Sequence, residues 1–198
     1  MNNNFKMIAK TFFGMEEVLK EELISLGGQN VECGNRLVSF YGDKGFMYKT
    51  NLCLRTALRI LVPIYTFYAN SYDDLYNELN KYDWNKYLDL SNTFLFDSVV
   101  TGNIFRHSLY VSQKAKDALV DSFYSRENDR PNVDLEYPDI RFHIHIRENK
   151  CTLLVDSSGE SLHKRGYRVS SDIAPINEVL AAGIINLSGW DKSTDFLD

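Results

Sequence analysis

Within the first seventy residues, stretches with the two-residue period of a strand alternate with stretches that have the period of a helix. Their order is strand, helix, strand, strand, helix, strand, over residues 5–12, 15–26, 29–33, 36–42, 43–54 and 59–69. This order is the split βαβ pattern of a ferredoxin-like unit. We therefore predict an α+β chain that opens with a ferredoxin-like domain.

Three local signals predict where the helices of this region begin and end. Gly27, followed by a second glycine, is expected to end the first helix, because glycine adopts the left-handed conformation that closes many helices. Asp43 is expected to cap the second helix. Ser71 with Asp74 resembles a capping box and predicts a further helix over residues 72–82.

The second half of the chain predicts another α/β arrangement. Strands are expected over 93–102 and as a pair within 140–159, with a loop over 130–139 and a final helix over 174–190. Residues 108–126 have the clearest helical period, and its apolar face consists of Val111, Ala115, Ala118, Leu119 and Phe123. Between these elements, three residues are expected to pack into a core: Trp84, Tyr87 and Leu88.

Composition excludes several classes of protein. The chain has 198 residues, of which 44% are hydrophobic and 25% charged, as in ordinary globular domains. No apolar run is long enough to span a membrane, and the N-terminus lacks the pattern of a signal peptide. Its three cysteines, Cys33, Cys53 and Cys151, form neither a disulfide framework nor a zinc motif. We therefore expect a cytoplasmic protein with reduced thiols.

The net charge of −5 argues against nucleic acid as a partner, but the charges are unevenly distributed. Residues 1–100 hold 10 basic and 12 acidic side chains, and residues 171–198 hold one and five. Residues 101–170 hold 11 and 10, together with all four histidines. Because screening limits the reach of distant charges to about 8–10 Å, a local basic face in this segment can still bind phosphate.

The first basic element surrounds the 108–126 helix. Arg106 and His107 precede it, and Lys114 and Lys116 lie off its apolar face. A helix N-terminus preceded by a cation suits a phosphate group, because free backbone N–H groups point outward there. Alternatively these lysines form an ordinary solvated face, in which Lys114 pairs with Asp117 three residues away.

The second basic element is the segment HKRGYR. Arg165 and Arg168 can each bind a phosphate through two N–H groups, and Lys164 can act as a point charge. Tyr167 could stack on an unpaired base, and Gly166 permits a positive φ. The alternative is a surface loop whose cations pair with nearby acids: Asp156, Glu160 or Asp172.

No motif of a catalytic centre is present. His143 and His145 alternate along a predicted strand and share a face, so a metal pair is conceivable, but no third ligand is close in sequence. The sequence contains no nucleophile elbow, P-loop or paired cysteine site. We therefore predict binding surfaces, no catalytic residue and no metal site in this chain.

Several segments together resemble one family, the THUMP-domain RNA methyltransferases, and within it the 23S ribosomal RNA guanine-N2 methyltransferase group. The similar segments follow the same order along nearly the whole chain: FFGMEEVLKEEL, LCLRTALRILVPI, YDWNKYL, KDALVDSF, RPNVDLEYPDI, DSSGESLHKRGYR and the apolar helix that ends in Gly-Trp. The combination of KDALVDSF, DSSGESLHKRGYR and the apolar helix that ends in Gly-Trp is specific, whereas each alone is weak.

The resemblance implies a ferredoxin-like domain over residues 1–69 and an RNA-binding THUMP domain over 70–168. Residues 169–198 would then be the lead-in segment of a Rossmann methyltransferase domain that uses S-adenosylmethionine and is absent here. The chain ends at Phe-Leu-Asp, where the cofactor loop of the family would begin, so we expect it to be part of a longer enzyme. In that enzyme, the cofactor would be lined by Pro175, Ile176 and Asn177.

The resemblance thus predicts a module that binds ribosomal RNA and positions it for a catalytic domain elsewhere. Its RNA contacts would be Arg106, His107, Lys114, Lys116, Lys164, Arg165, Tyr167 and Arg168. The exposed part of the 175–190 helix would contact the missing domain or a neighbouring chain. Two alternatives remain: a THUMP module of a transfer-RNA-modifying enzyme, and a protein-interaction domain without an RNA role.

Overall fold

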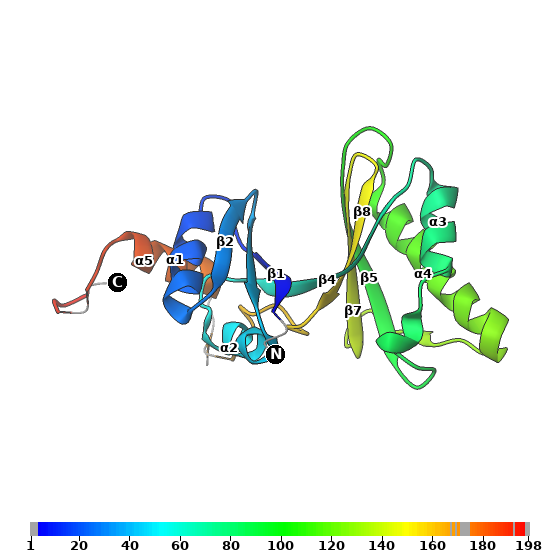
Figure 1. Ribbon diagram of the computed structural model, residues 1–198. Coiled ribbons are helices and arrows are strands. Elements are labelled where there is room, and N and C mark those ends of the chain that lie inside the picture. The colour runs from blue at the N-terminus through cyan, green and yellow to red at the C-terminus, as the bar shows by residue number, and fades with distance from the viewer. Residues whose placement is uncertain (1–3, 167, 169, 171–174, 192, 197–198) are drawn as a thin grey trace. The chain divides into compact units, whose positions relative to one another are not determined.

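The computed structural model describes residues 4–166, 168, 170, 175–191 and 193–196 (Figure 1). The chain divides into two compact units. The first unit combines Met1–Leu61 with Glu160–Asp198, and the second consists of Val62–Gly159. The start of the HKRGYR segment therefore lies in the first unit, where the N–H of Leu162 donates to the carbonyl of Leu58 at 2.8 Å.

The first unit is built on an antiparallel sheet whose strands lie in the order β2-β3-β1-β4. This order and the two helices between the strands are those of a ferredoxin-like fold, as the sequence predicted. Its elements are β1 (Phe5–Lys10), α1 (Glu16–Leu26), β2 (Gln29–Gly34), β3 (Leu37–Gly42), α2 (Lys44–Cys53), the first residues of β4 (Arg59–Tyr68) and α5 (Glu178–Leu187).

In the second unit, strands β4, β8, β7, β5 and β6 follow one another in that order. β5 runs parallel to β6 and β7, whereas β7 and β8 form an antiparallel hairpin. After the end of β4, its elements are α3 (Tyr72–Asn80), the 3-10 turn η1 (Trp84–Lys86), β5 (Thr93–Thr101), α4 (Ser108–Glu127), β6 (Asn132–Val133), β7 (Ile140–Arg147) and β8 (Lys150–Asp156).

The predicted helix boundaries are confirmed by their caps. Gly27 has a left-handed φ of 103° at the end of α1. The carboxylate of Asp43 accepts a hydrogen bond from the backbone N–H of Phe46 at 2.8 Å, which satisfies a donor of the first turn of α2. Ser71 accepts likewise from the N–H of Asp74 at 3.1 Å and opens α3.

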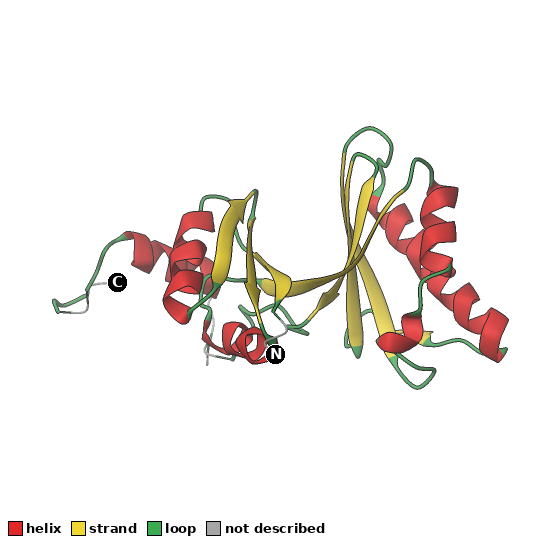
Figure 2. Cartoon of the chain, viewed as in Figure 1, coloured by secondary structure: helices red, strands yellow, loops and turns green. Residues whose placement is uncertain are grey.

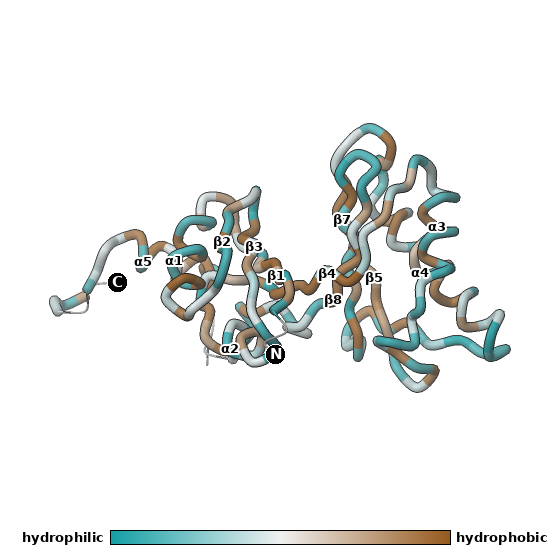
Figure 3. Tube along the Cα trace, in the orientation of Figure 1, coloured by the Kyte–Doolittle hydropathy of each residue, from teal (hydrophilic) through white to brown (hydrophobic). Residues whose placement is uncertain are grey.

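The core of the second unit lies between its sheet and two helices. α3 packs against α4, and α4 packs against β5, so the helices cover one face of the sheet (Figure 2). The apolar face predicted for α4 is buried at every position: Val111, Ala115, Ala118, Leu119 and Phe123. Hydropathy along the chain follows this arrangement, with apolar strands and a hydrophilic segment after the end of α4 (Figure 3).

Two predictions about this unit need correction. Trp84 and Leu88 are buried as expected, but Tyr87 is 36% exposed and lies at the surface. The segment 130–139, expected as loop, contains the short strand β6, whose residues pair in parallel with Thr93 and Phe94 of β5. Two residues are too few to show a period, so this pairing depends on the neighbouring strand and not on a local pattern.

The final helix α5 is only partly covered within the first unit. Val179 is buried, and Gly183 lies against the side chain of Met15, which would overlap any side chain placed at Gly183. Ile184 and Leu187 are 50% and 61% exposed, as the sequence analysis anticipated for part of this face. No helix among the described residues is both long and apolar enough to cross a membrane.

Candidate nucleic-acid interface

The start of α4 is exposed and carries two of the predicted contact residues. Arg106 and His107 are both exposed, and His107 occupies the N-cap position with extended backbone. Within the described residues, the His107 side chain caps no backbone N–H of the helix. The guanidinium of Arg106 donates to the carbonyl of Asn103 at 3.3 Å. Backbone donors and a cation therefore meet at this end of the helix, as an anion site requires.

Lys114 lies about two turns further along α4 and is largely enclosed. Its side chain is 25% exposed, and its ammonium lies 3.7 Å from the carboxylate of Asp73 on α3. The ammonium also lies 5.7 Å and 5.9 Å from the ring centres of Tyr76 and Tyr110. The hydroxyl of Tyr76 donates to Asp121 at 2.7 Å, and this hydrogen bond, with burial, raises the pKa of Tyr76 to about 12.

Lys116 is more accessible, with 43% of its side chain exposed. Its ammonium lies 2.8 Å from the carboxylate of Asp117. An ion pair within α4, the alternative to phosphate binding, is therefore formed. Its lysine is Lys116, whereas Lys114 pairs with Asp73. Because exposed pairs of this kind contribute about 0–1 kcal/mol, the pair does not prevent Lys116 from exchanging its partner for a phosphate.

The cations of the HKRGYR segment lie in the first unit, and each has a partner there. Lys164 is 3.8 Å from Glu160, and Arg168 is 3.1 Å from Glu178. The guanidinium of Arg165 donates to the carbonyls of Asn51 and Leu52, both at 2.8 Å. These carbonyls belong to the last turn of α2, so Arg165 caps that helix.

The backbone of this segment has the conformation that the glycine suggested. Gly166 has a φ of 74°, a region that other residues rarely adopt. Arg168 also donates to the carbonyl of Ile176 at 2.8 Å. Tyr167, the predicted stacking residue, lies outside the described residues. Of the predicted RNA contacts, four therefore belong to the second unit and three described ones to the first.

Replacing Arg165 with alanine is expected to lower the free energy of unfolding by about 2 kcal/mol, because hydrogen bonds from a charged donor contribute about 1.5–3 kcal/mol. Urea unfolding followed by circular dichroism measures this loss. Lys164→Ala is the matched control, and since it removes only an exposed ion pair we expect less than about 1 kcal/mol. Equal losses for the two variants would contradict a capping role for Arg165.

The histidine pair lies in a polar cluster on β7. The Nε2 atom of His143 is 3.5 Å from a carboxylate oxygen of Asp156 and 4.0 Å from one of Asp97. Arg141 donates to the same Asp97 carboxylate at 2.9 Å. Among the described residues, no three His, Cys, Asp or Glu side chains converge as metal ligands do. His143 therefore faces two carboxylates, one from β5 and one from β8.

The three residues predicted to line a cofactor lie just before α5, at its exposed start. Ile176 is 59% exposed, and the side-chain oxygen of Asn177 accepts from the N–H of Val179 at 3.0 Å, which caps α5. Pro175 is likewise exposed. No chemical step of methyl transfer is therefore assigned to these side chains.

Comparison with known protein families matches both units. Residues 6–61 match the RlmL ferredoxin-like domain, and residues 69–156 match the THUMP domain. The chain therefore consists largely of a ferredoxin-like domain followed by a THUMP domain. In this pairing the chain is similar to the ferredoxin-like and THUMP region of the ribosomal RNA large subunit methyltransferases of the K/L type.

Individual relatives agree with this assignment. Ribosomal RNA large subunit methyltransferase K/L of Desulfotalea psychrophila is 39% identical over 196 residues, which cover 98% of this chain and 27% of that protein. The crystal structure of a predicted N6-adenine-specific DNA methylase from Listeria monocytogenes has a TM-score of 0.79 and 27% identity, covering 95% of this chain and 49% of that one. A "putative methyltransferase complexed with SAH" has a TM-score of 0.78 and 29% identity, covering 96% and 50%. The chain thus spans about a quarter to a half of the length of these relatives.

Proposed function

We propose that this chain is the RNA-binding portion of an S-adenosylmethionine-dependent ribosomal RNA (guanine-N2) methyltransferase of the cytoplasm. The observation that carries the proposal is the THUMP match over residues 69–156, within a chain that resembles a ribosomal RNA methyltransferase over nearly its whole length. The module would bind RNA phosphates and hold a target base for a catalytic domain outside this chain. S-adenosylmethionine, bound in that domain, would supply the methyl group.

The structure supports the start of α4 as the central contact. Arg106 and His107 are exposed there, and backbone N–H groups of the first helical turn add further donors. Further along α4, 43% of the Lys116 side chain is exposed. Lys114 is proposed as a further contact, which would exchange its ion pair with Asp73 at 3.7 Å for a phosphate. In the first unit, Lys164, Arg165, Tyr167 and Arg168 are proposed as additional contacts, with Lys164 the most exposed described cation of that group.

The double variant Lys114→Glu/Lys116→Glu tests this contact. We expect its affinity for single-stranded RNA to fall about tenfold or more at moderate salt, because repulsion replaces two favourable charges. The slope of log affinity against log salt should become shallower by about 1.4, since each phosphate contact on a single strand contributes about 0.7. Fluorescence anisotropy with a labelled oligonucleotide at several salt concentrations measures both quantities.

Lys6→Glu/Lys44→Glu is the matched control, because it changes the net charge equally at two exposed lysines of the first unit. The single variant Lys116→Glu controls for misfolding of the double variant, because the side chain of Lys116 is more exposed than that of Lys114. If the double variant and the control bind RNA with the same affinity and the same salt dependence, α4 is not the contact.

A second candidate is a protein-interaction domain whose cations serve internal pairs. It is favoured by one observation: Lys114, Lys116, Lys164 and Arg168 each have a carboxylate within 4 Å. It predicts that RNA binds no better than heparin and that heparin competes fully. A THUMP module acting on transfer RNA is distinguished by measuring whether transfer RNA competes better than ribosomal RNA fragments of equal length.

A further inference from the structure

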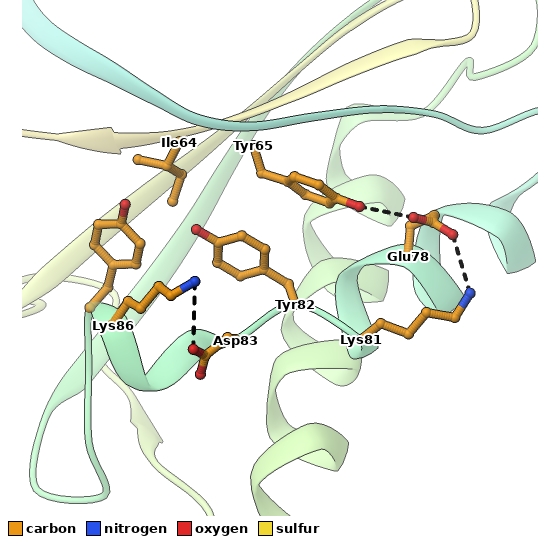
Figure 4. A pocket seen from close by; sticks show the side chains of 8 residues that line it. Ile64, Tyr65, Glu78, Lys81, Tyr82, Asp83 and Lys86 are labelled. Atoms are coloured by element: carbon orange, nitrogen blue, oxygen red, sulfur yellow. Dashed lines mark hydrogen bonds and ion pairs between the residues drawn. The ribbon is translucent and has the colours of Figure 1, made fainter. Parts of the chain in front are cut away.

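A pocket of about 480 Å³ opens in the second unit between β4, the end of α3 and η1 (Figure 4). Three tyrosines line it: Tyr65 from β4, Tyr82 from the link after α3, and Tyr87 just after η1. Its volume falls in the range of about 300–1,000 Å³ that is usual for small-molecule sites. No sequence motif marks this pocket, because its lining residues come from separate segments.

The tyrosine rings are held in place by the core behind them. Tyr82 contacts the buried ring of Trp84 edge-on, with centroids 5.0 Å apart. The centroids of Tyr65 and Tyr82 are 5.1 Å apart, and those of Tyr82 and Tyr87 are 6.5 Å apart with planes inclined by only 17°. Figure 4 shows the rings of Tyr65 and Tyr82 beside each other. An aromatic ligand would therefore meet preformed surfaces and require little reorganisation.

The charges at the rim cancel in pairs. Lys81 lies 3.2 Å from Glu78, and Lys86 lies 3.6 Å from Asp83. The hydroxyl of Tyr65 also donates to Glu78 at 3.0 Å. Two carboxylates beside two ammonium groups disfavour a polyphosphate but offer both acceptors and donors to the edge of a polar heterocycle.

We propose that this pocket binds one unpaired nucleobase of the RNA, stacked on the tyrosines and hydrogen-bonded at its edge by the paired charges. The carboxylates of Glu78 and Asp83 accept from amino or ring N–H groups of the base, and the two lysines donate to its carbonyl or ring nitrogen atoms. Stacking of bases on aromatic side chains is the usual means by which proteins hold single-stranded nucleic acid. This inference rests on the proposed RNA-binding function and adds a site separate from the start of α4.

Tyr87→Ala is the test, because Tyr87, which is 36% exposed, is the most accessible of the three lining tyrosines. We expect affinity for single-stranded RNA to fall about 5- to 100-fold, as on loss of one stacked base, with an unchanged salt slope because no phosphate contact is lost. Tyr87→Phe should keep most of the affinity, since it retains the ring. Tyr68→Ala, which removes a 65% exposed tyrosine of β4 outside the pocket, should bind as the unchanged protein does.

A duplex of the same length separates base binding from phosphate binding, because its bases are already stacked. Tyr87→Ala should not weaken binding of the duplex. Photocrosslinking of the unchanged protein to a 4-thiouridine oligonucleotide should label the peptides that contain Tyr65, Tyr82 or Tyr87, and this readout needs no variant to fold. The pocket proposal is wrong if Tyr87→Ala and Tyr68→Ala bind single-stranded RNA with the same affinity. It is also wrong if Tyr87→Ala weakens binding of the single strand and of the duplex equally. If the unchanged protein binds neither RNA, the proposed function itself fails.

Discussion

Replacing Trp84 with alanine is expected to lower the free energy of unfolding of the second unit by about 3–5 kcal/mol, the usual cost of removing a large aromatic ring from a core. Trp84 is completely buried, and its rings meet those of Phe96 and Phe142 edge-on at 5.8 Å and 5.3 Å. Its indole N–H donates to the carbonyl of Leu79 at 2.9 Å. The substitution would leave a cavity and remove one of the hydrogen bonds to the carbonyl of Leu79, which the N–H of Tyr82 also reaches at 3.2 Å.

Urea unfolding followed by circular dichroism measures this loss. Trp190→Ala is the matched control, because Trp190 lies in the C-terminal segment and packs on the half-exposed Phe196. We expect that control to lose less than about 1 kcal/mol. Trp190→Phe leaves Trp84 as the single tryptophan, so its fluorescence then reports unfolding of the second unit. A loss below about 1 kcal/mol for Trp84→Ala would show that this ring does not organise the core.

Glu22→Ala is expected to destabilise the first unit by about 2–3 kcal/mol, because one carboxylate satisfies three donors of a distant loop. Its Oε1 atom accepts from the N–H of Arg55 at 2.8 Å. Its Oε2 atom accepts from the N–H and the hydroxyl of Thr56, at 3.1 Å and 2.7 Å. Thr56 is fully buried, so its groups would have no water to replace the lost acceptor.

Differential scanning calorimetry of two further variants tests whether the hydrogen bonds or the charge matter. Glu22→Gln keeps an acceptor of the same shape and should lose less than the alanine variant. Glu21→Ala, at the exposed neighbouring position, should change stability by less than about 0.5 kcal/mol. If Glu21→Ala and Glu22→Ala lower the melting temperature equally, the loop does not depend on Glu22.

Features that depend on neighbours in sequence could be predicted. The buried face of α4, from Val111 to Phe123, follows from the helical period alone, and the caps at Asp43 and Ser71 follow from side chains three residues from their donors. The antiparallel order of the first unit followed from the strand and helix sequence. In each case the information lies in a local pattern of residues or in the order of successive elements.

Features that join distant residues could not be predicted. Arg165 was expected to bind phosphate, but its partners are carbonyls of α2 more than a hundred residues earlier, and backbone carbonyls leave no signal in a sequence. Tyr87 was expected in the core together with Trp84 and Leu88. Only the folded structure shows that it lines a pocket with Tyr65. The expectation that both basic segments share one RNA surface stays a prediction.

The composition of the first unit from two separated stretches has a consequence for how the protein matures. During synthesis, Val62–Gly159 leaves the ribosome before Glu160 and the residues after it. The second unit can therefore complete its fold while the first still lacks α5 and Arg165, whose guanidinium caps the C-terminus of α2. We expect the nascent chain to become protease-resistant first in its middle and only later at its N-terminal end, the reverse of the usual vectorial order.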